Sequence, residues 1–166
     1  MGDSAVRAGE QGGGGHGPVS FRGVSQLVLD AKGRLAIPSK HRDALANGDT
    51  KIVVTADPSR CLLLYPLATW EPIQAELMEF ASFDERIRGV QRLLVGHADD
   101  VDIDTTGRVL IPPALRQFAG LDKRVVLVGQ GRKFELWSDT AWQAQTARTI
   151  TFPVDGLPPG LERFSL

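Results

Sequence analysis

The feature that most constrains the fold is a fourteen-residue motif that occurs twice. The first copy, LDAKGRLAIPSKHR, spans residues 29–42, and the second, IDTTGRVLIPPALR, spans residues 103–116. Six residues are identical at fixed spacing, which is more than chance gives in so short a stretch. The shared residues are Asp30 and Asp104, Gly33 and Gly107, Arg34 and Arg108, Ile37 and Ile111, Pro38 and Pro112, and Arg42 and Arg116. The chain therefore contains two copies of one structural unit.

The pattern around each motif predicts strand, turn, strand, short helix and two further strands. In the first turn, at 31–33, Gly33 can take a positive φ. Pro38 suits the first position of a helix, and Asn47-Gly48 suits its end. We expect strands at 26–29, 34–37, 51–55 and 61–65 with a helix at 39–46, and in the second copy strands at 101–103, 108–111, 125–128 and 134–137 with a helix at 112–119. Units this small are marginal alone, so we expect them to pack together or to oligomerise.

The segments outside the two units set the domain boundaries. Apolar residues at helical spacing run from Trp70 to Leu94 with a break near Ser82, which predicts a helical connector. Residues 1–18 are rich in Gly and poor in apolar residues, so we expect them to be disordered. The expected divisions are 1–18 as a disordered extension, 21–70 as the first repeat, 71–95 as the connector, 96–145 as the second repeat and 146–166 as a weakly ordered tail.

Charge and composition narrow the classes of function. The net charge is −1, so nucleic-acid binding would require a local basic patch rather than a whole-chain attraction. The single cysteine, Cys61, excludes an intramolecular disulfide and favours a reducing compartment. The sequence has neither an apolar run long enough to span a membrane nor a hydrophobic signal core at its start. We therefore expect a cytoplasmic protein with no membrane partner.

The sequence lacks the usual signatures of metal binding and catalysis. The alternating aspartates at 100–104 resemble the start of a calcium loop, but the Gly and Glu that such a loop requires are missing. Cys61, His41 and His97 do not have the spacing of zinc ligands. No phosphate-binding Gly-rich loop or nucleophile elbow is present. We expect no enzyme activity, catalytic residue, metal, cofactor or small-molecule substrate.

The first motif carries a local excess of positive charge. From Asp30 to Asp43 there are four Lys or Arg residues against two Asp, a balance of +2 in a chain of −1. Arg and Lys at such a turn can contact phosphates, and Arg can also hydrogen-bond guanine. Alternatively, Asp30 and Asp104 could simply fix their turns by accepting backbone N–H bonds or by pairing with Arg34 and Arg108. In that case the chain could be a protein-interaction scaffold that does not bind DNA.

The paired motifs resemble those of the MraZ family, whose hallmark is Asp-x-x-x-Arg in each of two tandem AbrB-like repeats. FRG at Phe21, VQRLLVGHA at 90–98 and AGLDKRVVLVGQGRKFELW at 119–137 add to the resemblance, which covers about 21–145. It implies a β-rich mixed α/β fold, an AbrB-like swapped-hairpin (double-split) β-barrel formed by the two repeats as an internal pseudo-dimer. It also implies a ring-shaped homo-oligomer that binds short G-rich direct repeats in double-stranded DNA. Such a regulator would act upstream of the division and cell-wall operon, including its own gene, and would be associated with the nucleoid.

Carried over to this sequence, the resemblance places DNA binding mainly in the first repeat. The expected DNA-binding residues are Arg34 and Lys32 first, then Arg22, Lys40 and Arg42, with Arg108 as the counterpart in the second motif. The second turn has Thr105 and Thr106 in place of a lysine, and acidic residues precede it. The expected structural residues of the motifs are Asp30, Gly33, Asp104, Gly107 and Arg116.

Residues 1–18 precede the point at which family members usually start, close to a Phe-x-Gly segment. We therefore expect that translation begins naturally at Val19 from a valine-type start codon. Mass spectrometry of the native N-terminus tests this expectation.

Overall fold

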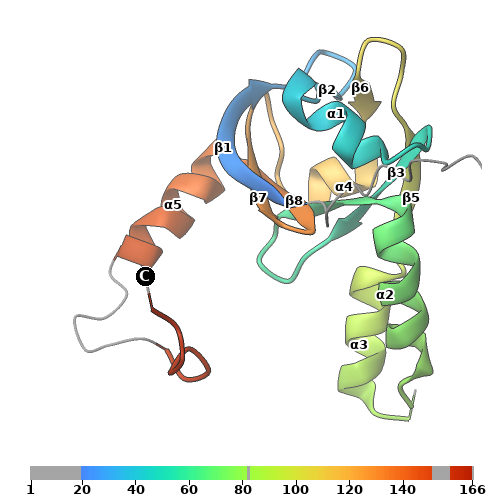
Figure 1. The fold of residues 1–166 in the computed structure, drawn as a ribbon, viewed down its shortest axis with the longest axis vertical. Helices are drawn as coiled ribbons and strands as arrows, with labels where there is room; N and C mark the ends of the chain where they lie inside the picture. The colour runs from blue at the N-terminus through green and yellow to red at the C-terminus, as the bar shows by residue number, and fades with distance from the viewer. Residues whose placement is uncertain (1–19, 82, 151–157, 166) are drawn as a thin grey trace, which may run out of the picture.

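The computed structural model describes residues 20–81, 83–150 and 158–165. Within these ranges the chain forms eight β-strands and five α-helices (Figure 1). The first repeat contains β1 (Phe21–Val28), β2 (Arg34–Ala36), α1 (Ser39–Ala46), β3 (Lys51–Ala56) and β4 (Leu62–Pro66). The helices α2 (Leu67–Glu79) and α3 (Glu85–Leu94) follow. The second repeat contains β5 (Asp99–Asp102), β6 (Arg108–Leu110), α4 (Pro113–Phe118), β7 (Arg124–Gly131), β8 (Lys133–Ser138) and α5 (Asp139–Ile150).

The two repeats exchange strands. The larger sheet has the order β1-β7-β8-β4-β3-β5, and the smaller one consists of β2 and β6. Strand β1 therefore pairs with β7 of the second repeat, while β5 pairs with β3 of the first, all antiparallel. β1 and β5 are the edges of the larger sheet, and the described pairings do not close it into a barrel. The expected β-rich mixed α/β class with two repeats is confirmed.

The interlocking corrects one expectation drawn from the local pattern. A strand, a short turn and a strand in direct succession, as expected at 26–37, ordinarily pair as a hairpin. Instead, β1 pairs with β7 and β2 pairs with β6, so the turn at 31–33 joins two different sheets. Local alternation of apolar residues defines a strand but does not select its partner, which here comes from the other repeat.

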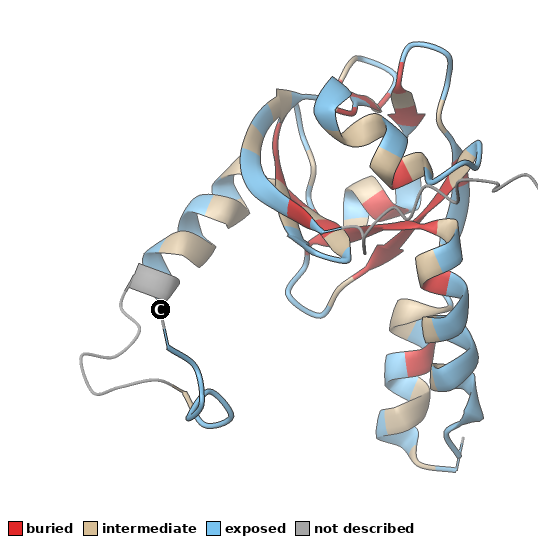
Figure 2. Cartoon of the chain, in the orientation of Figure 1, coloured by how far each residue is buried: buried red, intermediate tan, exposed pale blue. Residues whose placement is uncertain are grey.

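A single core joins the two repeats. One face of the larger sheet packs against β2, β6, α1 and α4, and its buried residues come from both halves of the chain (Figure 2). The strands β3 and β4 are buried on both faces because α2 and α3 cover the opposite side around Val53, Leu63 and Trp70. This explains their nearly continuous apolar sequences, IVVTA and LLLYP. Similarly, α5 covers Val126 and Trp137 at the other end of the sheet.

The helical segments agree with the sequence pattern except at their ends. The helix expected at 39–46 is α1, and the break near Ser82 separates α2 from α3. However, α2 begins at Leu67, directly after β4, and α5 continues to Ile150, beyond the boundary expected at 145. The expectations for residues 1–18 and for the natural start at Val19 lie outside the described residues. Among the described residues, no helix has the length and apolarity needed to cross a membrane.

Candidate nucleic-acid interface

The first motif forms a turn whose aspartate holds both backbone and side-chain donors. Asp30 Oδ1 accepts from the backbone N–H groups of Lys32 and Arg34, at 3.0 and 2.8 Å. Arg34 Nε donates to Asp30 Oδ2 at 2.6 Å. The turn itself is closed by Gly33 N–H donating to Asp30 O, with Gly33 at φ +83°. The guanidinium of Arg34 is thus attached to a rigid turn.

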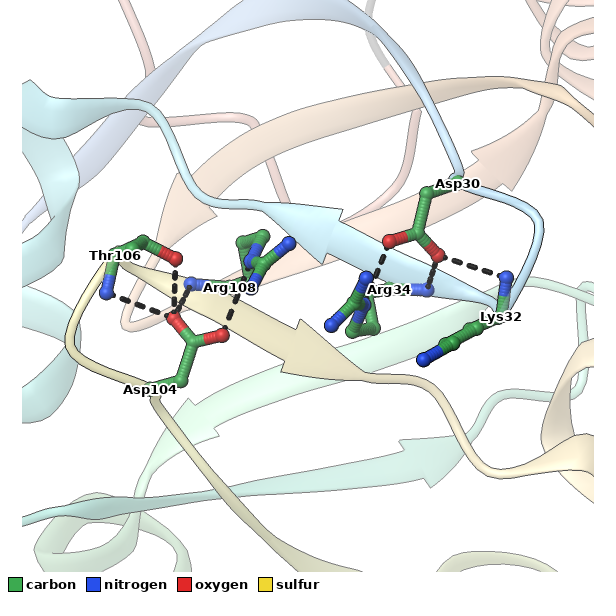
Figure 3. A network of polar contacts seen from close by, with 6 residues as sticks. All are labelled: Asp30, Lys32, Arg34, Asp104, Thr106 and Arg108. Carbon is green, nitrogen blue, oxygen red and sulfur yellow. Dashed lines mark hydrogen bonds and ion pairs between the residues drawn. The ribbon is translucent and has the colours of Figure 1, made fainter.

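The second motif repeats this geometry. Asp104 Oδ1 accepts from the backbone N–H groups of Thr106 and Arg108 and from the Thr106 hydroxyl. Arg108 Nε donates to Asp104 Oδ2 at 3.0 Å. Gly107 takes φ +78° and donates its N–H to Asp104 O. Figure 3 shows the two turns at opposite ends of the β2–β6 sheet.

The hydrogen bonds keep both aspartates ionised. The backbone N–H of Arg34, followed by its side chain, lowers the pKa of Asp30 from its ordinary value, although partial burial opposes this. The backbone N–H of Arg108 and the Thr106 hydroxyl hold the pKa of Asp104 well below its usual range. Each carboxylate therefore stays charged at neutral pH and holds its arginine as an ion pair.

The two motif arginines lie on one exposed face of the small sheet. The register pairs Arg34 with Leu110 and Ala36 with Arg108, so the four side chains share a face. The intervening pair, Leu35 with Val109, points into the core and is fully buried. Ala36 and Leu110 are exposed, and the side chains of Arg34 and Arg108 are 31% and 37% accessible. No hydrogen bond among the described residues uses the Nη atoms of either arginine.

A second pair of arginines joins each turn to the opposite repeat. Arg42 Nε donates to Ile37 O at 2.7 Å, and a Cβ added at Gly107 would lie 2.1 Å from that same Nε. Ile37 N–H donates to Gly107 O across the two repeats. Thus Arg42, expected to contact DNA, has its Nε bonded to Ile37 and lies against the second turn. Its half-buried guanidinium helps to fix that turn.

Arg116 makes the reciprocal contact. Its Nε donates to Ile111 O at 3.0 Å, and a Cβ at Gly33 would lie 2.5 Å from Arg116 Cζ. Ile111 N–H in turn donates to Gly33 O. The absence of a Cβ at each motif glycine therefore serves two purposes, a positive φ and a close approach by an arginine. The sequence reveals the glycines but not the arginines that cover them.

The remaining candidate cations occupy different places. Lys32 is exposed in the first turn, and Lys40 is exposed near the start of α1. Arg22 is exposed near the start of β1, opposite Gln130 of β7. It lies about 20 Å along the strand from Val28, because an extended residue spans roughly 3.3 Å. The structure therefore brings Lys32 to the motif turn but leaves Arg22 at the distant end of β1.

A histidine beside these cations was not singled out as a packing residue. His41 of α1 packs against Phe134 at 4.9 Å and against Phe21 at 6.2 Å between ring centroids. Burial, followed by the charge of Lys40, lowers the pKa of His41. Within the described ranges, no three or more His, Cys, Asp or Glu side chains gather so as to hold a metal ion.

Two interlocked repeats, each presenting an arginine held by an aspartate, define a tandem-repeat β protein with a charged two-stranded face. A family model described as "MraZ protein, putative antitoxin-like" matches residues 20–93 and 94–155. The chain is 54% identical over 147 residues to "Transcriptional regulator MraZ" of Thiobacillus denitrificans, covering 88% of this chain and 99% of that one. It is 58% identical over 148 residues to the protein of the same name from Nitrosomonas eutropha, with the same coverage. The chain belongs to the MraZ family. These relatives are named as regulators rather than as enzymes, which agrees with the absence of catalytic motifs from the sequence.

Proposed function

We propose that this protein is a transcriptional regulator that binds double-stranded DNA through the exposed face of β2 and β6. The observation that carries the proposal is the pair Arg34 and Arg108, which share this face and whose Nη atoms make no hydrogen bond with any residue in the described ranges. The names of the relatives, "Transcriptional regulator MraZ", support the same function. A two-stranded antiparallel sheet is one of the elements that fits the major groove of DNA.

The aspartates prepare the arginines for base recognition. Because Asp30 and Asp104 hold Nε, each guanidinium loses little further freedom when its Nη atoms meet a base. Arg most often recognises guanine, through the O6 and N7 acceptors in the major groove. G-rich target sites are therefore the expected targets of this face. Leu110, 49% exposed beside Arg34, is suited to contact a thymine methyl group.

The first repeat contributes more positive charge than the second. Lys32 in the first turn corresponds to Thr106 in the second, and Lys40 of α1 corresponds to Ala114 of α4. We assign Lys32 and Lys40 to phosphate contacts, with Arg22 as a peripheral one. Arg42 contributes its charge and holds the turn. The first repeat is thus the stronger DNA-binding half.

Self-assembly would multiply these contacts. We propose that the protein forms a ring-shaped homo-oligomer, associated with the nucleoid, that binds short direct repeats upstream of its own gene in the division and cell-wall operon. Joined copies bind neighbouring sites at a high effective concentration, which strengthens individually weak contacts. We also propose that the exchanged strands form an AbrB-like swapped-hairpin barrel. The pairing of β1 with β7 and of β5 with β3 supports this arrangement.

Fluorescence anisotropy with duplexes from the region upstream of the gene tests the DNA-binding function. Arg34→Ala should weaken binding by about 1–3 kcal/mol, which is roughly 5- to 150-fold, and should relax the preference for guanine. Arg92→Ala removes an equal charge from α3, which covers the opposite face of the larger sheet from β2 and β6, and should change binding little. If the wild-type protein shows no salt-dependent binding to any of these duplexes, the alternative of a protein-interaction scaffold replaces this proposal.

A further inference from the structure

The α2–α3 hairpin ends in an apolar groove. The two helices extend beyond the sheet, and their outer ends are largely exposed (Figures 1 and 2). Phe80 is 55% exposed and Val90 is 44% exposed, and both line a groove of about 420 Å³. The groove is lined by Leu77, Phe80, Asp84, Arg86, Ile87 and Val90. Contiguous exposed apolar surface rimmed by charge is typical of an interaction site.

Polar contacts fix the shape of this groove. Gln91, 8% exposed, donates from Nε2 to Leu77 O and Phe80 O at 3.2 and 3.3 Å, so it joins α3 to the end of α2. Asp84 caps α3 by accepting from Arg86 N–H at 2.8 Å. The hairpin is therefore held in shape by its own contacts, and the groove does not have to be formed by a partner.

A second exposed apolar feature lies near the C-terminus. Leu161 and Phe164 are 43% and 53% exposed. Successive turns order them, because Leu161 N–H donates to Pro158 O and Phe164 N–H donates to Leu161 O. Glu162, between them, accepts from Gly160 N–H at 2.9 Å. The segment 158–165 thus presents two apolar side chains that flank a Glu-Arg pair.

We propose that the C-terminal segment, residues 158–165, of one copy occupies the α2–α3 groove of a second copy of this chain. The chemistry of the two features is complementary. Leu161 and Phe164 supply apolar side chains to a groove with an apolar floor, and the segment carries one acidic and one basic residue. Glu162 would face Arg86, and Arg163 would face Asp84. Arg86 already pairs with Asp84 at 3.1 Å, but its side chain is 91% accessible, so a carboxylate of another copy can reach it from the solvent side.

The positions of the two features determine the geometry of assembly. Figure 1 shows α5 and the C-terminal segment on one side of the molecule and the α2–α3 hairpin on the other. A contact between two different surfaces of identical chains is head-to-tail, and such contacts close into a ring or continue as a filament. This inference rests on the proposed self-assembly, and it is independent of DNA recognition.

Mixing two single-cysteine variants tests the contact directly. The natural Cys61 is fully buried and does not compete. Val90→Cys protein mixed with Phe164→Cys protein should give a disulfide-linked dimer on mild oxidation, because both positions are exposed and would meet between copies. Val24→Cys, at 56% exposure on β1, mixed with Phe164→Cys is the matched control and should give little dimer.

Two outcomes of the mixing experiment would overturn the proposal. One is a yield of mixed dimer no greater than the control. The other is a double variant, Val90→Cys with Phe164→Cys, that oxidises only within a single chain, since the segment would then occupy its own groove. If the chain still assembles in either case, self-assembly stands and uses another surface. A chain that stays monomeric at every concentration contradicts both proposals.

A charge exchange provides an independent test in sedimentation velocity. Arg86→Glu and Glu162→Lys should each raise the concentration for half-assembly by about tenfold, and the double variant should restore it. Arg86→Glu removes the ion pair with Asp84 but keeps the backbone N–H that donates to Asp84, so the cap of α3 remains. Equal and additive effects of the two changes, without restoration, would show that these residues do not face each other.

Discussion

The side chain of Arg42 lies across Gly107 of the opposite repeat, so close that a Cβ at that position would displace the arginine. Its Nε donates to Ile37 O, and Ile37 N–H donates to Gly107 O, so one short chain of contacts connects α1 to the second motif turn. Arg116 and Gly33 form the same arrangement in reverse. Arg34 follows a turn that Arg116 of the other repeat covers, and Arg108 follows a turn that Arg42 covers.

Substitution of Gly107 should reveal this contact. Gly107→Ala places a methyl group at φ +78° and displaces Arg42 from Ile37 O, so we expect a loss of about 2–4 kcal/mol in urea unfolding. Gly131→Ala is the matched control, because Gly131 has φ +76° and open space around it. Gly131→Ala should lose only the stability that an alanine at positive φ costs, about 1–2 kcal/mol. In an Arg42→Ala background the cost of Gly107→Ala should fall to that of the control, and full additivity would contradict the contact.

Neutralising Asp30 should weaken DNA binding, although it removes a negative charge from a turn of the proposed DNA-binding face. Asp30→Asn takes away the carboxylate that accepts from Arg34 Nε, so the guanidinium loses its fixed orientation. We expect a fall in affinity of about tenfold, from the order of 1 kcal/mol of a charge-assisted hydrogen bond. Asp100→Asn, an exposed aspartate on β5, is the control and should leave affinity equal or slightly higher. Tighter DNA binding by Asp30→Asn would show that the charge of residue 30, and not the orientation of Arg34, determines the affinity.

Adding a lysine to the second repeat should strengthen DNA binding. Ala114 is exposed on α4 at the position that corresponds to Lys40, so Ala114→Lys gives the second repeat a cation for the proposed phosphate contact that only the first has. The slope of log affinity against log salt should become more negative by about 0.9. Lys40→Ala should change the slope by the same amount in the opposite direction. An unchanged slope in both variants would place α1 and α4 outside the DNA contact.

Stability should decrease in mild acid because of His41. Its pKa is lowered in the folded state by burial against Phe21 and Phe134, so the unfolded chain binds more protons around the ordinary pKa of about 6.5. Stability that is present at pH 7.5 is therefore lost as the pH falls through that value. His41→Phe should reduce the change in the urea midpoint between pH 7.5 and 5.5. His97→Gln, at an exposed histidine, should leave that change as it is. If the urea midpoint changes equally with pH in the wild type and in both variants, other groups cause the loss of stability.

Local sequence patterns predict the elements better than their partners. The turn glycines, the helix at 39–46 and the strands of β3 and β4 follow from φ preference, capping and apolar runs, all of which act over a few residues. The pairing of β1 with β7 requires a choice between two similar repeats, and the local pattern around the first turn suggested a hairpin instead. The family resemblance implied an internal pseudo-dimer of the two repeats, and strand pairing between the repeats is observed for β1 with β7 and for β5 with β3.

The role of Arg42 shows the same limit at the level of one side chain. Its charge and its place in a basic cluster suggested DNA contact, while its neighbour Gly107 belongs to the other repeat. One signal was available in the sequence. Arg42 and Arg116 are identical between the two motifs, whereas Lys32 and Lys40 occur only in the first. The same repetition holds for Arg34 and Arg108, so it distinguishes Arg42 from the two lysines, and only the contact with Gly107 distinguishes it from Arg34.

The exchange of strands also has a consequence for how the two halves of the gene can change. The glycine of each motif turn is covered by an arginine of the other half, Gly33 by Arg116 and Gly107 by Arg42. A substitution at one of these glycines or arginines therefore changes a contact of the other repeat, as it would not in two domains that fold independently. Each motif glycine and the arginine that covers it therefore depend on each other across the two halves, whereas Lys32 and Lys40 of the first half have no such counterpart in the second.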